Sequence, residues 1–246
     1  MERQINDQID RYLADVQQAI YEPTLVRELS DIPLISREEA FFILLPFLNG
    51  AEQTEETYQA AIALGAVFSA LHAHGRVDLH DSSSTEQQLT VLAGDHYSGI
   101  HYRLLANLQS FPFIRALSKA IARSNEEKTE LFFHVPQTPE EWQKSMLMSD
   151  VALITTYYDV FGFEEYTEYA EYVLPYHYAT ERLQNEQISS DLRRQLQTYL
   201  RSKVEKVITV NRASLNESLL QVITTPLMNT EGERIGTKPK TCPSSI

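Results

Sequence analysis

The sequence contains a single cysteine, Cys242, among its 246 residues. One thiol can form neither an intrachain disulfide nor a zinc site built from several cysteines, which favours a reducing compartment. Residues 1–6 include no apolar signal-peptide core, and the longest apolar run, residues 40–48, is much shorter than the ~20 residues of a membrane-spanning helix. These absences predict a cytoplasmic protein without a transmembrane segment.

Basic residues are also scarce. The chain has 21 Lys and Arg against 34 Asp and Glu, so its formal net charge is −13. A nucleic-acid partner is not expected, because no cationic surplus is available to neutralise phosphates. Only 8 glycines and 10 prolines are present, and the apolar fraction of 43% is sufficient for one large core. This composition favours an all-α protein over a strand-and-turn architecture.

The first half of the chain shows repeated helix signals. Residues 5–20 place apolar side chains at helical spacing. Ser36 and Glu39 form a capping-box pattern before the apolar helix 40–48, which Pro46 is expected to kink or shorten and Asn49-Gly50 to end.

Another helix follows the N-cap Thr54, and its residues 60–73 are apolar on nearly every side, which predicts a central, buried helix. Gly75 is expected to end it. A capping box of Ser83 and Glu86 is expected to begin the next helix.

The second half is expected to contain helices over residues 111–124, from Thr138 to Phe161 with a stop at Gly162, over 164–186 with an interruption at Pro175, and over 191–224. No repeat or low-complexity linker divides the chain. We therefore expect one domain of about nine or ten helices over residues 1–228 and a disordered tail over 229–246.

Residues 58–106 resemble the first half of an all-α trans-prenyl diphosphate synthase. A buried helix is followed by a polar loop, and the next helix carries Val91 to Tyr97 (Val-Leu-Ala-Gly-Asp-His-Tyr), similar to the Leu-Ala-Gly-Asp-Tyr of that superfamily. The resemblance implies an isoprenoid-synthase fold. Its enzymes hold Mg²⁺ between two aspartate-rich motifs on facing helices, because hard cations require carboxylate oxygens and the leaving diphosphate requires neutralisation.

The first metal motif is not intact. If residues 69–72 match the Ser-Leu-x-His that precedes it, residues 73–77 (Ala-His-Gly-Arg-Val) stand where Asp-Asp-x-x-Asp belongs. A register shifted by one turn places Val77 to Asp81 there and retains Asp78 and Asp81 as weak metal candidates. The arginine pair that usually follows is replaced by serines 82–84. This chain is therefore not expected to bind a metal on its own.

The second metal motif is equally depleted. Glu164, Glu165 and Glu168 have suitable spacing, but they come too early in the chain, and glutamates at a helix N-terminus have an ordinary electrostatic explanation. Residues 173–185 are the better positional match, and they offer only Glu181 beside Arg182.

Taken over most of its length, including the tyrosine-rich residues 166–178, the chain resembles component 1, the small subunit of two-component heptaprenyl diphosphate synthase. The resemblance implies a heterodimer with a catalytic component 2, which would hold Mg²⁺ and extend farnesyl diphosphate with four isopentenyl diphosphates. The C35 product would supply a menaquinone side chain. The chain itself would help to set product length.

The resemblance also indicates which side chains would serve that role. Those that would form the floor of a product tunnel or contact the partner lie on the buried helix and around the Gly-Asp motif: Ala66, Val67, Phe68, Ala70, Gly94, Asp95 and Ser98. Small residues one turn apart, such as Gly94 and Ser98, allow a neighbouring backbone to approach closely.

Two other functions are compatible with the sequence. An α-helical metal-dependent phosphohydrolase is suggested by the adjacent His80 and Asp81, although His72/His74 and His96/His101 lack the spacing of ligands on one helix face. A helical adaptor could use an exposed tyrosine-rich face over residues 166–178 as a protein interface.

Overall fold

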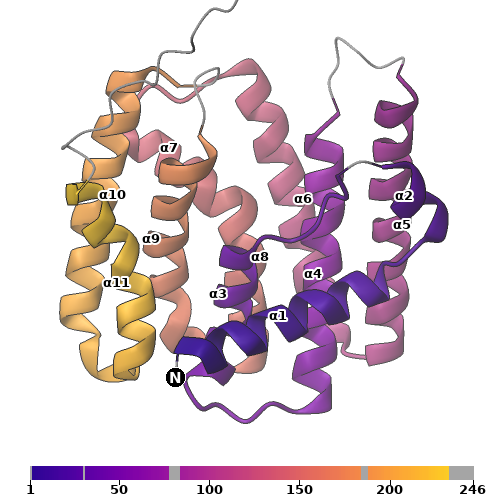
Figure 1. The fold of residues 1–246 in the computed structure, drawn as a ribbon, viewed down its shortest axis with the longest axis horizontal. Helices are drawn as coiled ribbons and strands as arrows, with labels where there is room; N and C mark the ends of the chain where they lie inside the picture. Colours follow the sequence, from indigo (N-terminus) through magenta and orange to yellow (C-terminus); the bar gives the residue numbers. More distant parts are fainter. Residues whose placement is uncertain (1, 30, 78–83, 184–187, 233–246) are drawn as a thin grey trace, which may run out of the picture.

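The computed structural model describes residues 2–29, 31–77, 84–183 and 188–232 (Figure 1). These residues form helices and no strands, which confirms the all-α class. The α-helices are α1 (Glu2–Ala19), α2 (Pro23–Glu28), α3 (Arg37–Leu48), α4 (Glu55–Gly75), α5 (Thr85–Leu108), α6 (Phe111–Phe133), α7 (Pro139–Met146), α8 (Ala152–Phe161), α9 (Thr167–His177), α10 (Ser190–Val210) and α11 (Glu217–Gly232).

Shorter helical segments connect several of these helices. A π-helical turn, Leu147–Val151, joins α7 to α8 without a break, and a second π-helical turn, Tyr178–Arg182, extends α9. Short 3₁₀ segments lie at Glu164–Tyr166 and Arg212–Ser214. Because α7 and α8 form one continuous rod, the described residues contain ten helical rods, in agreement with the predicted nine or ten.

Helix α4 is the central element of the bundle. Thr54 caps its N-terminus through a hydrogen bond from the backbone N–H of Thr57, and nearly every residue from Ala60 to Ala73 is buried. The helix packs against α1, α3, α5 and α8. In Figure 1, α5 lies beside α4 at one edge of the molecule, and α10 and α11 form the other edge. The prediction of a central buried helix is confirmed.

Helix α1 crosses over α3 and α4 and buries the predicted apolar face of residues 5–20 (Figure 1). The crossing is close at Gly65 of α4, where a Cβ atom would lie 2.6 Å from Cγ2 of Val16. The Tyr12 hydroxyl donates a hydrogen bond to the carbonyl oxygen of Ala61 at 2.7 Å. Burial raises the pKa of Tyr12 well above its ordinary value, which keeps this hydroxyl a donor.

Neither internal proline ends its helix. The expected early end at Pro46 and the expected interruption at Pro175 are wrong, because α3 continues to Leu48 and α9 to His177. Pro46 lies in the last turn of α3 and has no N–H to donate to the carbonyl of Phe42. The buried hydroxyl of Tyr158 in α8 donates to that carbonyl instead. A hydrogen bond from another helix thus satisfies the group that the proline leaves free.

Two other boundaries differ from the predictions. Ser84, rather than Ser83, is the N-cap of α5 and accepts a hydrogen bond from the backbone N–H of Gln87. Helix α6 continues to Phe133 instead of ending near residue 124. The boundaries of α8 at Gly162, which has a φ of +77°, and of α3 at Asn49-Gly50 agree with the sequence signals.

The expected single helix over 191–224 is wrong, because the chain turns between α10 and α11 (Figure 1). The Asn211 carbonyl accepts a hydrogen bond from the Tyr169 hydroxyl at 2.7 Å, and the Asn216 side chain caps the start of α11. Asn49 reaches the same corner and donates to the carbonyl of Ser214 at 2.7 Å. Helix α11 continues past the predicted domain boundary at residue 228, and residues 233–246 of the predicted tail lie outside the described residues.

Candidate functional site

The second half of α4 presents polar side chains within an apolar interior. Ser69 accepts a hydrogen bond from the backbone N–H of Ile35 at 3.0 Å and donates to the carbonyl of Gly65 at 2.9 Å. His72 lies one turn later on α4. The segment before α3 is thereby fixed against α4, and this brings Glu39 close to His72.

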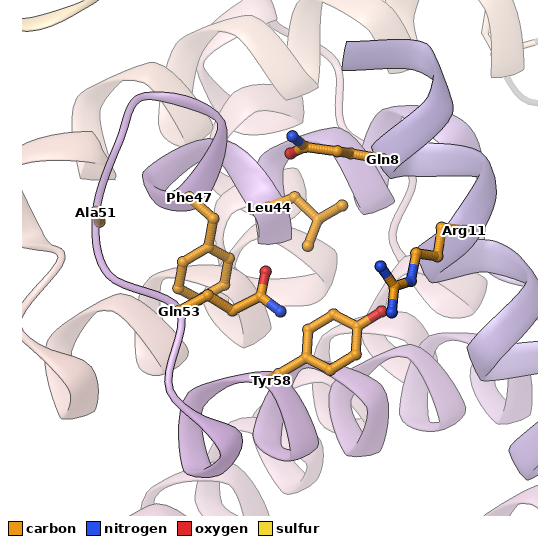
Figure 2. Close-up of a pocket in the computed structure, with 7 residues that line it drawn as sticks. All are labelled: Gln8, Arg11, Leu44, Phe47, Ala51, Gln53 and Tyr58. Atoms are coloured by element: carbon orange, nitrogen blue, oxygen red, sulfur yellow. The ribbon is translucent and has the colours of Figure 1, made fainter. Parts of the chain in front are cut away.

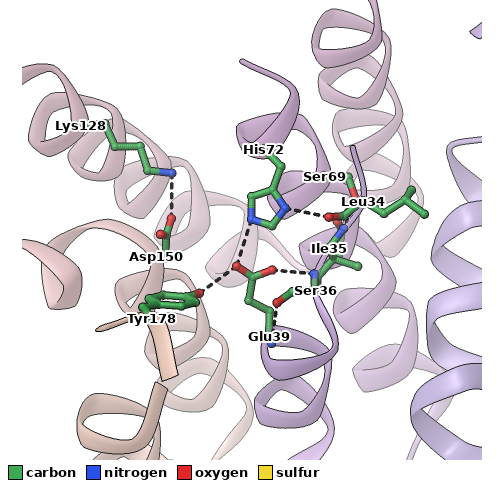
Figure 3. Close-up of polar contacts among 10 residues, drawn as sticks. Leu34, Ile35, Ser36, Glu39, Ser69, His72, Lys128, Asp150 and Tyr178 are labelled. Carbon is green, nitrogen blue, oxygen red and sulfur yellow. Dashed lines mark hydrogen bonds and ion pairs between the residues drawn. The ribbon is translucent and has the colours of Figure 1, made fainter. Parts of the chain in front are cut away.

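Glu39, His72 and Tyr178 form a buried hydrogen-bond network that joins α3, α4 and the end of α9 (Figure 3). Glu39 has no exposed surface. Its Oε1 lies 3.0 Å from His72 Nε2 and accepts from the Tyr178 hydroxyl at 2.8 Å, and its Oε2 accepts from the backbone N–H of Ser36 at 2.8 Å. Both carboxylate oxygens are therefore engaged, as a buried charge requires.

The proton positions in this network follow from its partners. His72 Nδ1 lies 2.7 Å from the carbonyl of Leu34, which can only accept, so Nδ1 bears a hydrogen. One further proton lies between His72 Nε2 and Glu39 Oε1. Burial lowers the pKa of the neighbouring His177, although Glu181 and Glu38 oppose that shift. The Glu39–His72 pair thus joins a fully buried carboxyl group of α3 to a partly exposed imidazole of α4.

A second polar pair links α6 to the π-helical turn. Lys128 Nζ lies 2.8 Å from Asp150 Oδ1 (Figure 3). The π turn adds one residue to the helical path, and such turns often occur at functional sites. Trp142 of α7 is nearby in the fold and is 5% exposed, and its indole Nε1 has no hydrogen-bond partner in the described part of the chain.

A cavity of about 670 Å³ opens at the C-terminal end of α4. Its walls come from the end of α4, from α5, from α6 with the segment that follows it, and from α7: His74, Gly75, Val77, Val91, Lys128, Leu131, Phe132, Val135, Pro136 and Trp142. These include three of the residues, 74, 75 and 77, that stand where the resemblance places the first metal motif. No carboxylate is present among these lining residues.

The expected tunnel residues of α4 are all interior. Ala66, Val67, Phe68 and Ala70 are buried, and Phe68 has no exposed surface. None of the four side chains can contact a partner directly unless the packing around α4 changes. Their burial does not test an effect on product length, which stays a prediction.

The Gly-Asp motif lies on α5, opposite the end of α4. A Cβ atom on Gly94 would lie 2.5 Å from Cε1 of His74, so the close approach expected at Gly94 is to a histidine ring rather than to a backbone. Asp95 is exposed, and its Oδ1 lies 3.8 Å from His74 Nε2. Ser98 is half-buried one turn further along α5.

The described residues at the end of α4 do not fit a Mg²⁺ site. Asp78, Asp81 and the His80-Asp81 pair lie outside the described residues. In the described ranges, no three His, Cys, Asp or Glu side chains form a group that could hold a metal ion. Glu164 and Glu165 are exposed on a 3₁₀ turn, and Glu168 accepts a hydrogen bond from Asn211 at 2.7 Å. The lining of the cavity supplies nitrogen donors and apolar groups, whereas Mg²⁺ requires oxygen ligands.

The tyrosine-rich segment is not an exposed face, so the interface expected for an adaptor is wrong. Tyr166, Tyr169, Tyr176 and Tyr178 are buried, and only Tyr172 of this set is partly accessible. The spacing of these tyrosines places them on one face of a helix, but spacing alone does not show whether that face is buried or exposed. The hydrogen bonds of Tyr169 and Tyr178 to the chain show that this face belongs to the core.

A smaller cavity of about 260 Å³ lies between α1, the end of α3 and the start of α4 (Figure 2). Leu44 and Phe47 contribute apolar side chains to its lining, and Gln8, Arg11 and Gln53 contribute polar ones. The Tyr58 hydroxyl donates to Asp15 at 2.6 Å, and burial together with this bond raises the Tyr58 pKa. This cavity is separate from the network around Glu39 and contains none of the residues predicted from the sequence.

The Glu39–His72–Tyr178 network was not predicted from the sequence. Glu39 was interpreted only as part of a capping box, and that interpretation is confirmed, because Ser36 and Glu39 make both capping hydrogen bonds. The available signal was a glutamate one residue before an uninterrupted apolar run. Such a carboxylate turns inward with the helix face, and it then requires a buried partner.

Comparison with known proteins agrees with the resemblance found in the sequence. The family model for heptaprenyl diphosphate synthase (HEPPP synthase) subunit 1 matches residues 26–225. Heptaprenyl diphosphate synthase component 1 of Geobacillus stearothermophilus is 36% identical over 86 residues, which are 35% of this chain and 39% of that relative. The alignment thus spans less than half of the relative.

The fold agrees as well. The crystal structure of heptaprenyl diphosphate synthase from Staphylococcus aureus superimposes with a TM-score of 0.55 and 14% identity, covering 94% of this chain and 98% of that one. At this identity the similarity concerns the fold, and it confirms the expected isoprenoid-synthase-like bundle. Within the described residues, no helix has both the length and the apolar character needed to cross a bilayer. By the match over residues 26–225, the chain belongs to the heptaprenyl diphosphate synthase subunit 1 family.

Proposed function

We propose that this chain is the small, non-catalytic component of a two-component heptaprenyl diphosphate synthase. One observation carries the proposal. In the resembling enzymes, two facing helices hold Mg²⁺ between aspartate motifs. Here the corresponding parts of α4 and α9 are connected by His72, Glu39 and Tyr178, whose polar atoms already bond to one another. The described lining of the cavity at the end of α4 includes no carboxylate, the ligand that Mg²⁺ prefers.

The chemistry is then assigned to a catalytic component 2 in the cytoplasm. That partner would carry both aspartate motifs with their Mg²⁺ and extend farnesyl diphosphate by four isopentenyl units to the C35 diphosphate of a menaquinone side chain. Mg²⁺ would neutralise the leaving diphosphate in the partner's site. The contribution of this chain would be assembly and the shape of the complex.

The proposed contribution to product length rests on α4. Phe68 is fully buried, so Phe68→Ala would loosen the packing of α4 against its neighbours instead of removing a surface contact. A matched control is Phe113→Ala, because Phe113 of α6 is also fully buried but packs on Tyr157 and Phe161. The proposal expects longer or more dispersed products with Phe68→Ala only. Unchanged products from a correctly assembled Phe68→Ala complex would contradict it.

The role itself is tested by reconstitution. Farnesyl diphosphate, labelled isopentenyl diphosphate and Mg²⁺ are incubated with this chain alone, with the large component from the same organism alone, and with both. We expect a C35 product only from the mixture. Product from this chain alone would show that it binds Mg²⁺ and catalyses the reaction. A large component that is equally active without this chain would also refute the proposed role.

A further inference from the structure

The cavity between α1, the end of α3 and the start of α4 combines apolar and polar side chains in a small space (Figure 2). Leu44, Phe47 and Ala51 supply apolar groups, and Tyr58 adds an aromatic ring. Leu44 is buried, whereas the other three are half-buried. A volume of about 260 Å³ is slightly below that of most drug-sized ligand sites. The cavity therefore suits a compact ring and not a long hydrocarbon chain.

Arg11 of α1 is the one charged side chain among the described residues that line this cavity, and within them it makes no hydrogen bond or ion pair. Asp7 and Asp15 lie four residues before and after it on the same helix, a spacing at which Arg and Asp ordinarily pair. Asp15 instead accepts a hydrogen bond from the Tyr58 hydroxyl at 2.6 Å. Figure 2 shows the Arg11 guanidinium beside that hydroxyl. Its donors are thus available to an acceptor from outside the chain.

Two amide groups accompany the guanidinium. Gln8 of α1 and Gln53 of the loop before α4 line the same cavity, and neither side chain forms a hydrogen bond to another described residue. A guanidinium fork and an amide N–H together offer donors to both oxygens of one carboxylate. None of the described lining residues is acidic, and the Asp15 carboxylate is already bonded to Tyr58. The polar part of the cavity therefore favours an anionic group.

We propose that this cavity binds a compact molecule that carries an aromatic ring and a carboxylate. The ring lies against Leu44, Phe47 and Tyr58, because two aromatic side chains favour an aromatic ligand over an aliphatic one of equal size. The carboxylate accepts hydrogen bonds from Arg11 and Gln53. This binding does not depend on the proposed role in prenyl transfer, since α1, α3 and α4 of this chain form the cavity.

Three probes that share one ring system and differ in their heads test the proposal: naphthylacetate, naphthylethanol and naphthylethylamine. Each is titrated into the full chain and followed by calorimetry. Naphthylacetate should bind saturably and at least about tenfold more tightly than naphthylethanol, because only the carboxylate forms charge-assisted hydrogen bonds. Naphthylethylamine should bind most weakly. Absence of saturable binding of naphthylacetate overturns the proposal, as does equal affinity of the acid and the alcohol.

The place of binding is measured from leucine methyl signals in NMR spectra. Leu44 lines this cavity, whereas Leu131 lines the cavity at the end of α4. Naphthylacetate should shift the Leu44 methyl signals and leave those of Leu131 unchanged. A shift at Leu131 without one at Leu44 would place the ligand in the other cavity, and the proposal would be wrong.

Two arginines of α1 provide matched variants. Arg11 lines the cavity, whereas Arg3, which is also exposed, does not. Arg11→Gln should weaken naphthylacetate about tenfold and change naphthylethanol less than about twofold, while Arg3→Gln should change both less than about twofold. Circular dichroism checks that both variants are folded. Ala51→Leu fills apolar space and should weaken the acid and the alcohol alike. Equal affinities of the two arginine variants for naphthylacetate would overturn the proposal.

Discussion

The crossing of α1 over α4 predicts a large effect of one methyl group at Gly65. The Cβ atom of Gly65→Ala would lie 2.6 Å from Val16 Cγ2 and 2.7 Å from the Tyr12 hydroxyl oxygen. Neither neighbour can move away easily, because Val16 and Tyr12 are fully buried and the Tyr12 hydroxyl is bonded to Ala61. Overpacking of about 2 kcal/mol and a weakened hydrogen bond outweigh the gain in helix propensity, so we expect a net loss of about 2 kcal/mol.

A glycine in the neighbouring helix provides the opposite case. Gly99 of α5 is exposed, and a Cβ atom there would meet nothing within 4 Å. Gly99→Ala should therefore stabilise the chain by up to about 1 kcal/mol through helix propensity alone. The two substitutions are chemically identical and both lie inside helices. Opposite signs would show that the packing of α1, and not the helix backbone, determines the result.

The measurement is urea unfolding followed by circular dichroism, with free energies compared at constant m. A double-mutant cycle identifies the cause, because Val16→Ala removes the two methyl carbons that lie nearest to the new Cβ. The Gly65→Ala/Val16→Ala protein should lose less stability than the sum of the two single variants. Wild-type stability of Gly65→Ala, or strict additivity with Val16→Ala, would refute the proposed packing.

Three further predictions concern polar groups. Glu39→Ala should lower the free energy of unfolding by about 3 kcal/mol, because it removes the buried carboxyl group that His72 bonds to. Tyr178→Phe removes one hydrogen bond and should lower it by about 1 kcal/mol. Equal losses in urea unfolding would contradict the network. Burial lowers the pKa of His101 to about 4. The neutral ring therefore stabilises the folded state above pH 6.5, and this stability should be lost, by up to about 3 kcal/mol, as the pH falls toward 4. His101→Leu should flatten the dependence of the unfolding free energy on pH. Gly94→Ala should change stability by less than about 1 kcal/mol, because the half-exposed His74 ring can move aside, and a cost as large as that of Gly65→Ala would argue against such movement.

Local signals predicted most helix starts because capping depends on neighbouring residues. Ser36, Thr54 and Thr138 each cap the helix that follows them, as their patterns indicate. The errors arise where distant residues decide the outcome. Pro46 does not end α3, since Tyr158 satisfies the carbonyl that the proline leaves free, and the two residues are far apart in sequence. The corner between α10 and α11 likewise depends on Asn49, which is 165 residues away from its partner Ser214.

The candidate site was predictable only in part for a related reason. The Gly-Asp motif and the depleted metal motif are local patterns, whereas the close approach of Gly94 in α5 to His74 at the end of α4 is seen only in the structure. The burial of the tyrosines at 166–178 was not predictable, since periodicity identifies a face without showing what covers it. The hydrogen bond between Tyr178 and Glu39 likewise joins residues that are 139 positions apart in the sequence. Such pairings depend on how the helices assemble.

The two departures from the catalytic pattern support each other. If residues 73–77 occupy the first metal motif, as the resemblance implies, His74 and Val77 offer no oxygen ligand there. In the Glu39–His72–Tyr178 network, His72 of α4 and Tyr178 of the turn after α9 both bond to Glu39 of α3, and both oxygens of Glu39 are engaged. If the chain is the non-catalytic component, as proposed, its lack of metal ligands would involve the packed core around Glu39 as well as one motif, and restoring a single motif would not be sufficient for catalysis.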